Sequence, residues 1–235
     1  MKKAFLFAPL FLVFFILVTQ CKKDDELITD DHTTDDDIIL EDDTLPSPPT
    51  PNPLMYTSEE EAFILSGDSA DPFAIMNYYL QPDSIILRNP SINVLFNETS
   101  DSINKILVDR MYTTLRTTNG VGIAAPQIGV NRRVIWVQRF DKGPVAPFEV
   151  YFNPLITMYS TEVLQRADGC LSVPTGAGWP VINNFSYRAT WVDVEYYLID
   201  GTFVQERVNQ PYTAHIFQHE IDHLDGIMFM DRDSL

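Results

Sequence analysis

Two histidines near the end of the chain have the spacing of metal ligands. His219 and His223 are four residues apart, and Glu220 directly follows the first of them. Residues four apart lie on one face of a helix, so both imidazoles can bind one divalent ion, with the carboxylate beside them as a general base. A catalytic zinc-type site uses three protein ligands and one open position. The histidine pair therefore requires a third donor from elsewhere in the chain.

The third ligand is expected upstream of the histidines. Only twelve residues follow His223, and their acidic members, Asp225, Asp231 and Asp233, come too soon after the helix end. The lack of a downstream ligand also makes an HExxH endopeptidase the least favoured of the hydrolase classes.

Cys170 is the strongest upstream candidate, because a thiolate is a common zinc ligand. It is the only cysteine after Cys21 and lies in the stretch DGCLSVP, between a small residue and a predicted strand. An isolated cysteine is more often a small buried apolar residue, and the missing ligand is what favours metal binding. Of the other histidines, His32 lies in an acidic segment, and we interpret His215 as a packing residue.

The first 21 residues have the layout of a lipoprotein signal. Two lysines precede an apolar run at 4–18, and Cys21 follows it. The run is short for a membrane span, and this order is typical of a secretory signal that ends at a lipid-modified cysteine, although Gln20 is not the usual small residue. We expect an exported chain, anchored to a bacterial membrane by lipid on the periplasmic or cell-surface side. An uncleaved anchor or an ordinary cleaved signal is the alternative.

Residues 22–55 are expected to form a solvated tether. They hold eleven of the 33 acidic residues, between Asp24 and Asp43, followed by five prolines. Such a segment cannot bury enough apolar surface to fold. The net charge of −17 and the lack of a basic cluster argue against a nucleic-acid partner.

The remaining residues predict an α+β domain preceded by an extension. The extension, residues 56–84, has no functional interpretation beyond one or two short helices. Apolar residues at three- and four-residue spacings predict a helix at 100–119, capped by Ser100 or Asp101, and a closing helix covers about 212–224. Runs of apolar and β-branched residues predict strands at 133–138, 149–156, 171–174 and 189–199.

The connection GVGIAAPQIG, residues 120–129, contains small residues that let a backbone approach a ligand. Its Gln127 carries an amide that can donate a hydrogen bond to an oxyanion.

Three segments together resemble the signature motifs of peptide deformylases. GVGIAAPQ, DGCLS and QHEIDHL occur in the order and roughly the spacing of that family, and HLDGIMFMDR continues the similarity towards the C-terminus. The resemblance covers residues 85–235. It implies a peptide-deformylase-like fold, with mixed or antiparallel strands around a C-terminal HExxH helix. It also implies that Cys170, His219 and His223 are the metal ligands.

The resemblance further implies the reaction and the other site residues. Glu220 would act as acid and base on a water molecule, and Gln127 with the backbone N–H of Leu171 would stabilise the oxyanion, as the formyl group leaves an N-formylmethionyl peptide. One Fe²⁺ or Zn²⁺ ion is implied, and zinc is favoured outside the cytoplasm because iron and thiolate are oxidised there. The substrate would bind as an added strand. The expected substrate-binding residues are Gly120, Val121, Gly122, Ile123 and Arg188.

One departure and the expected export leave alternatives open. The family usually has Glu where this chain has Asp168, and that acid supports a metal ligand through charged hydrogen bonds. An exported protein would also not meet nascent chains. The alternatives are an enzyme acting on a different N-acyl substrate and a non-catalytic lipoprotein that binds formyl peptides. We expect a monomer in each case.

Overall fold

The computed structural model describes residues 55–234. The predicted signal, with Cys21, and all but the last residue of the predicted tether lie outside the described residues. Within residues 55–234, no helix has the length and apolar character needed to cross a bilayer.

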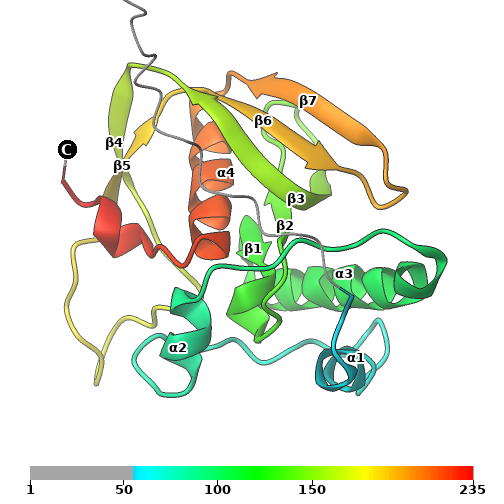
Figure 1. Ribbon diagram of the computed structural model, residues 1–235. Helices are drawn as coiled ribbons and strands as arrows, with labels where there is room; N and C mark the ends of the chain where they lie inside the picture. The colour runs from blue at the N-terminus through cyan, green and yellow to red at the C-terminus, as the bar shows by residue number, and fades with distance from the viewer. Residues whose placement is uncertain (1–54, 235) are drawn as a thin grey trace, which may run out of the picture. The chain divides into compact units, whose positions relative to one another are not determined.

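A five-stranded antiparallel sheet forms the framework of the domain (Figure 1). No other strand of the described chain pairs with the outer edge of β1. The strand order is β1 (Gly122–Ala124), β2 (Val134–Gln138), β3 (Phe148–Tyr159), β6 (Val192–Tyr197) and β7 (Phe203–Val208). A separate two-stranded sheet contains β4 (Val163–Ala167) and β5 (Phe185–Ala189).

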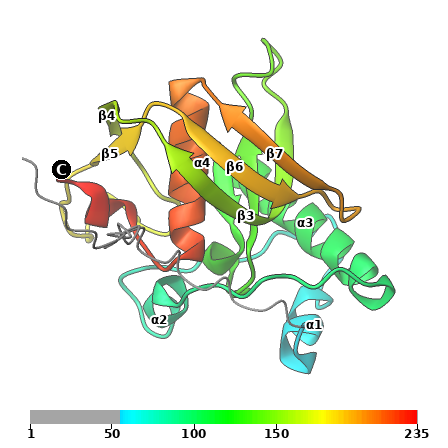
Figure 2. The same cartoon turned by 45° about the horizontal axis from the view of Figure 1, so that its top comes forward.

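Two helices cover opposite faces of the five-stranded sheet (Figures 1 and 2). α3 (Glu98–Thr118) packs on one face and α4 (Pro211–Leu224) on the other. The alternation along β2 explains this arrangement, because successive side chains of a strand point to opposite faces. Val134 lies in the apolar cluster with α3, whereas Ile135 and Val137 lie in the cluster with α4.

α4 is buried over the twelve consecutive residues 213–224. Gln210 caps its first turn, and Pro211 occupies the first turn, where no intrahelical donor is lost. Gln218 joins the helix to β5: its amide accepts from Ala189 N and donates to Ala189 O, both at 2.9 Å. This double contact fixes the position of the helix that carries both predicted histidine ligands.

The N-terminal extension packs against α3. It contains α1 (Ser58–Ile64), and α2 (Asp83–Arg88) follows at its end. Arg110 of α3 donates to the carbonyl oxygens of Ile64, at 2.7 Å, and Asp71, at 3.0 Å. The extension is therefore attached by buried polar contacts as well as by apolar packing.

The predicted helix at 100–119 begins earlier than expected. Its cap is Asn97 and not Ser100 or Asp101. The Asn97 side chain accepts from Ser100 N at 2.8 Å, and the Ser100 hydroxyl accepts from Asn97 N at 3.0 Å, so Ser100 is the third residue of this reciprocal cap.

The predicted strands are confirmed at β2, β3 and β6, but the strand predicted at 171–174 is wrong. A turn stands there, closed by a hydrogen bond of 3.0 Å from Val173 N to Cys170 O. Pro174 has no N–H to donate to a neighbouring strand. The short strand β1, the partly exposed strands β4 and β7, and the largely buried strand β5 were not predicted.

Candidate metal centre and active site

Three donor atoms from two separate segments meet at one point. The sulfur of Cys170 and one ring nitrogen each of His219 and His223 all lie within 4.8 Å of one another. Cys170 Sγ is 3.2 Å from His223 Nε2. α4 supplies the two imidazoles, and the loop between β4 and β5 supplies the thiol. One sulfur and two imidazole nitrogens suit Zn²⁺ or Fe²⁺, so these residues fit a divalent ion.

The two histidines differ in their electrostatic environment. Burial opposes protonation of His219, but the adjacent Asp168 carboxylate raises the pKa of His219 well above its usual value. Burial and the charge of His219 lower the pKa of His223 well below its usual value. The lowered pKa favours the neutral form of His223, which is the form that binds a metal.

Asp168 orients the first histidine. Its Oδ1 atom lies 2.7 Å from His219 Nδ1, which leaves Nε2 of that ring for a metal. The other oxygen, Oδ2, accepts from Ser186 Oγ at 2.6 Å and from Arg188 Nε at 3.2 Å. Burial opposes ionisation of Asp168, but His219, His215 and Arg188 lower its pKa well below the usual range. The shorter acid therefore still reaches the metal ligand.

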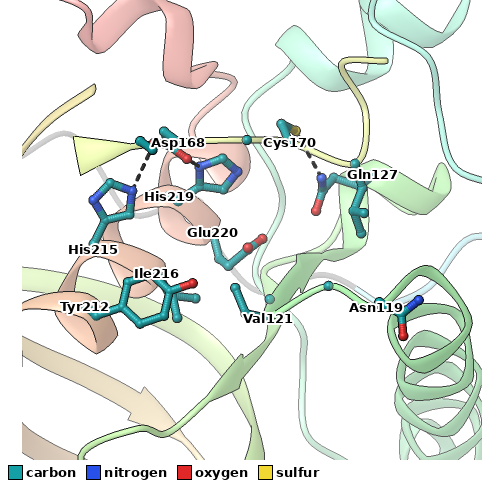
Figure 3. A pocket seen from close by; sticks show the side chains of 15 residues that line it. Asn119, Val121, Gln127, Asp168, Cys170, Tyr212, His215, Ile216, His219 and Glu220 are labelled. Atoms are coloured by element: carbon teal, nitrogen blue, oxygen red, sulfur yellow. Dashed lines mark hydrogen bonds and ion pairs between the residues drawn. The ribbon is translucent and has the colours of Figure 1, made fainter. Parts of the chain in front are cut away.

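His215 is a further partner of Asp168 that sequence reasoning missed. Its Nε2 atom lies 3.2 Å from Asp168 Oδ2 (Figure 3). His215 is 4% exposed, as expected of a packing residue, but it also lines the cavity beside the metal ligands. The available signal was its spacing of four residues from His219, which places both imidazoles on one helical face.

Glu220 points into the cavity towards β1 (Figure 3). It is 4% exposed, and burial raises the pKa of Glu220 to about 7. Its Oε2 atom has no hydrogen-bond partner in the described chain. A carboxyl group with a pKa near neutrality can both take a proton from water and return it. Gly122 makes room for this group, because a Cβ atom there would lie only 2.4 Å from Glu220 Oε1.

Gln127 lies in the short 3₁₀-helix η1 (Ala125–Ile128), directly after β1. Its Oε1 accepts from Ala124 N at 2.8 Å, and its Nε2 lies 3.3 Å from Cys170 Sγ (Figure 3). Leu171 follows the cysteine, and its backbone N–H has no protein acceptor among the described residues. Both predicted oxyanion donors are thus next to the ligand cluster.

Two residues of the N-terminal extension connect the loops that carry these donors. Met76 N donates to Gln127 O, and Tyr78 N donates to Ser172 O, each at 2.8 Å. Because one extended segment holds both loops, their separation is fixed by backbone hydrogen bonds.

The cavity next to the ligands has a volume of about 330 Å³. Gly120, Val121 and Gly122 line it, and their contact with a substrate stays a prediction. Ile123 is fully buried in the core, so only its backbone can meet a substrate. Further apolar surface comes from Leu171, Tyr212 and Ile216.

Arg188 was predicted to contact substrate, but it does not line this cavity. It is buried behind Asp168, where its Nη1 donates to Asp222 Oδ2 at 2.7 Å and its Nε donates to Asp168. This position supports a role in holding Asp168, and it does not support the predicted contact with substrate.

Comparisons with known proteins agree with this geometry. The model of the polypeptide deformylase family matches residues 75–234, a range that includes ten residues assigned above to the extension. The peptide deformylase of Desulforudis audaxviator is 39% identical over 160 residues, which cover 68% of this chain and 92% of that protein.

Solved structures are also similar. The actinonin-bound class I type b peptide deformylase of Acinetobacter baumannii is 34% identical in sequence, with a TM-score of 0.59. The match covers 69% of this chain and 99% of the A. baumannii chain. The Met-Ala-Ser-bound structure of the same enzyme has 36% identity, a TM-score of 0.57 and the same coverage. Since the family model matches more than half of the sequence, the chain belongs to the peptide deformylase family.

Proposed function

We propose that this protein is a metal-dependent peptide deformylase, which hydrolyses the N-formyl group of formylmethionyl peptides. The observation that carries the proposal is the convergence of Cys170, His219 and His223 with Glu220 and Gln127 around one cavity. When bound by the three donors, a divalent ion supplies a Lewis acid that polarises the formyl carbonyl and makes a water molecule more acidic.

The side chains of the cavity perform the proton transfers. Glu220 takes a proton from the attacking water and delivers it to the amine nitrogen as the C–N bond breaks, which gives formate and a free N-terminus. The Gln127 amide and the Leu171 N–H donate to the formyl oxygen as it gains negative charge. One such donor typically contributes about 3 to 4 kcal/mol to the stability of a transition state.

The free edge of β1 suits an extended peptide. A peptide that pairs with Gly120 to Gly122 would gain backbone hydrogen bonds and place alternate side chains in the cavity. The apolar surface of Val121 and Ile216 is compatible with methionine as the first residue. The Met-Ala-Ser complex of the A. baumannii relative supports this substrate class.

We also propose that the ion is Zn²⁺ or Fe²⁺ and that the protein is a monomeric lipoprotein, exported and anchored through Cys21. The ligand set supports the choice of ions, and the order of lysines, apolar run and cysteine supports the anchor. Changing Cys21 to Ser should move the protein from the membrane fraction to the soluble fraction and abolish incorporation of labelled fatty acid. Equal membrane association of both forms would refute the lipid anchor.

The assay for the reaction is formate release by the chain from residue 22 onward, loaded with Zn²⁺ or Fe²⁺ under argon. Formyl-Met-Ala-Ser should yield formate, whereas acetyl-Met-Ala-Ser should remain intact. Glu220→Gln should lower kcat by at least about 100-fold, the lower end of the effect of general acid–base catalysis, with unchanged metal content. Stoichiometric metal without formate release would refute the proposed reaction and favour a protein that only binds peptides.

A further inference from the structure

His215 is a buried histidine that the proposed reaction does not use. It is not one of the three metal donors, yet its Nε2 atom lies 3.2 Å from the carboxylate that orients His219. We propose that His215 is a positioning residue, which holds Asp168, and through it His219, in the geometry required for metal binding. This inference rests on the proposed metal-dependent function.

The contacts of Asp168 are divided between its two oxygens. Oδ1 faces His219, and Oδ2 faces His215, Ser186 and Arg188. Because the carboxylate has contacts on both oxygens, rotation about the Cβ–Cγ bond would break several of them at once. The plane of the carboxylate is therefore fixed, and so is the direction in which it faces the metal ligand.

The partners of Oδ2 come from two different elements. Ser186 and Arg188 both belong to β5, whereas His215 belongs to α4, the helix that also carries His219. Asp168 thus bridges residues four apart on one helix, as Figure 3 shows. The contact with His215 attaches the carboxylate of Asp168 to α4, the helix that carries His219. The contacts with β5 alone would not attach it to that helix.

Space around the carboxylate is limited by these same contacts. Four side chains surround Asp168, which is itself buried. An acid longer by one methylene group would have to displace one of them. His215 therefore also supplies a contact that holds the short acid, which stands in place of the Glu expected from the family resemblance.

The test compares two polar substitutions of similar size. The amide of Gln reaches about as far as Nε2 of a histidine, whereas the amide of Asn ends near the position of Nδ1. Zn²⁺ affinity is measured by competition with a chromophoric chelator, and the Co²⁺-loaded proteins are compared by visible absorption. His215→Asn should weaken Zn²⁺ binding about 10- to 100-fold, as is typical when a partner of a metal ligand is lost. His215→Gln should stay within about threefold of the wild type.

Phe217→Leu is the control for general loosening of α4, because Phe217 is fully buried in the same helix and is not a partner of Asp168. It should lower Tm without changing the Co²⁺ spectrum or the Zn²⁺ affinity. As a second test, Asp168→Glu should weaken Zn²⁺ binding in the wild-type chain, and His215→Ala in the same protein should restore part of it by making room.

Equal Zn²⁺ affinity and Co²⁺ spectra for the Asn variant and the wild type would overturn the inference, as would equal losses in the Asn and Gln variants. If the wild-type chain binds no divalent ion, the proposed function fails together with this inference. If the wild type binds Zn²⁺ and releases formate but the Asn variant is unaffected, only the role of His215 is refuted.

Discussion

The catalytic position of Glu220 depends on the absence of a side chain at residue 122. In Gly122→Ala, the new methyl carbon would lie 2.4 Å from Glu220 Oε1 and 2.9 Å from both Cγ and Cδ. Ordinary contacts between non-bonded heavy atoms lie near 3.5 Å, so the carboxylate must retreat by roughly 1 Å. A displacement of about 1 Å can lower the rate of an enzyme about 100-fold. We therefore expect kcat to fall by about two orders of magnitude.

The decisive comparison is between kcat and Zn²⁺ affinity in the same preparation. The three atoms nearest to the added methyl carbon all belong to Glu220, which is not one of the three metal donors. Gly122→Ala should therefore bind Zn²⁺ within about threefold of the wild type, whereas loss of a partner of a metal ligand typically weakens binding at least about 10-fold. Wild-type kcat in Gly122→Ala would show that the position of the Glu220 carboxylate is not critical.

Three other changes test the remaining parts of the structure. Cys170→Ser should weaken Zn²⁺ binding by more than the roughly 10- to 100-fold effect of losing a residue that hydrogen-bonds a metal ligand. The same Zn²⁺ affinity in the variant and the wild type, measured by competition with a chelator, would exclude the thiol as a ligand. Gln127→Ala should lower kcat about 10²- to 10³-fold with little change in KM, and a change in KM alone would contradict the oxyanion role. Burial opposes ionisation of Asp141 and Glu206, but hydrogen bonds from Arg139 lower the pKa of both carboxyls. Their stabilising contribution is present above the unfolded pKa, near 4, and is lost as the pH falls through the folded pKa. Tm should therefore decrease as the pH is lowered below about 4, and Arg139→Met should show a smaller decrease of Tm over the same pH range.

The sequence was informative about α4 because a helical period and a chemical pattern coincide there. The helix predicted at 212–224 runs from Pro211 to Leu224. The spacing of His219 and His223 required a third donor, and the structure places Cys170 beside them. Such a deduction succeeds because the coordination chemistry fixes how many ligands are needed, although the sequence does not show which loop approaches the helix.

The supporting contacts could not be predicted in the same way. Arg188 was predicted to contact substrate, but its surroundings depend on the pairing of β4 with β5. Each of these strands is only five residues long, and the sequence did not predict either of them. His215 was interpreted as a packing residue because burial and polar contact are both compatible with its position. Periodicity predicts which face of a helix is covered, but it does not say which side chain covers it.

Partners are distributed unevenly among the buried polar residues of α4. The Gln218 amide is paired with the backbone of Ala189 in β5 and of Ala214 in α4. Asp222 accepts hydrogen bonds from Arg188 and Arg232. Glu220 Oε2 and His223 Nδ1, by contrast, have no hydrogen-bond partner in the described chain, and the same is true of Thr213 Oγ1 and His215 Nδ1. Unpaired buried polar atoms destabilise a fold, so their retention needs a compensating reason. Gln218 and Asp222 attach the helix to its neighbours, His223 lies beside the thiol and Glu220 lines the cavity. We therefore infer that α4 separates two tasks: Gln218 and Asp222 provide attachment, and Glu220 and His223 provide reactivity.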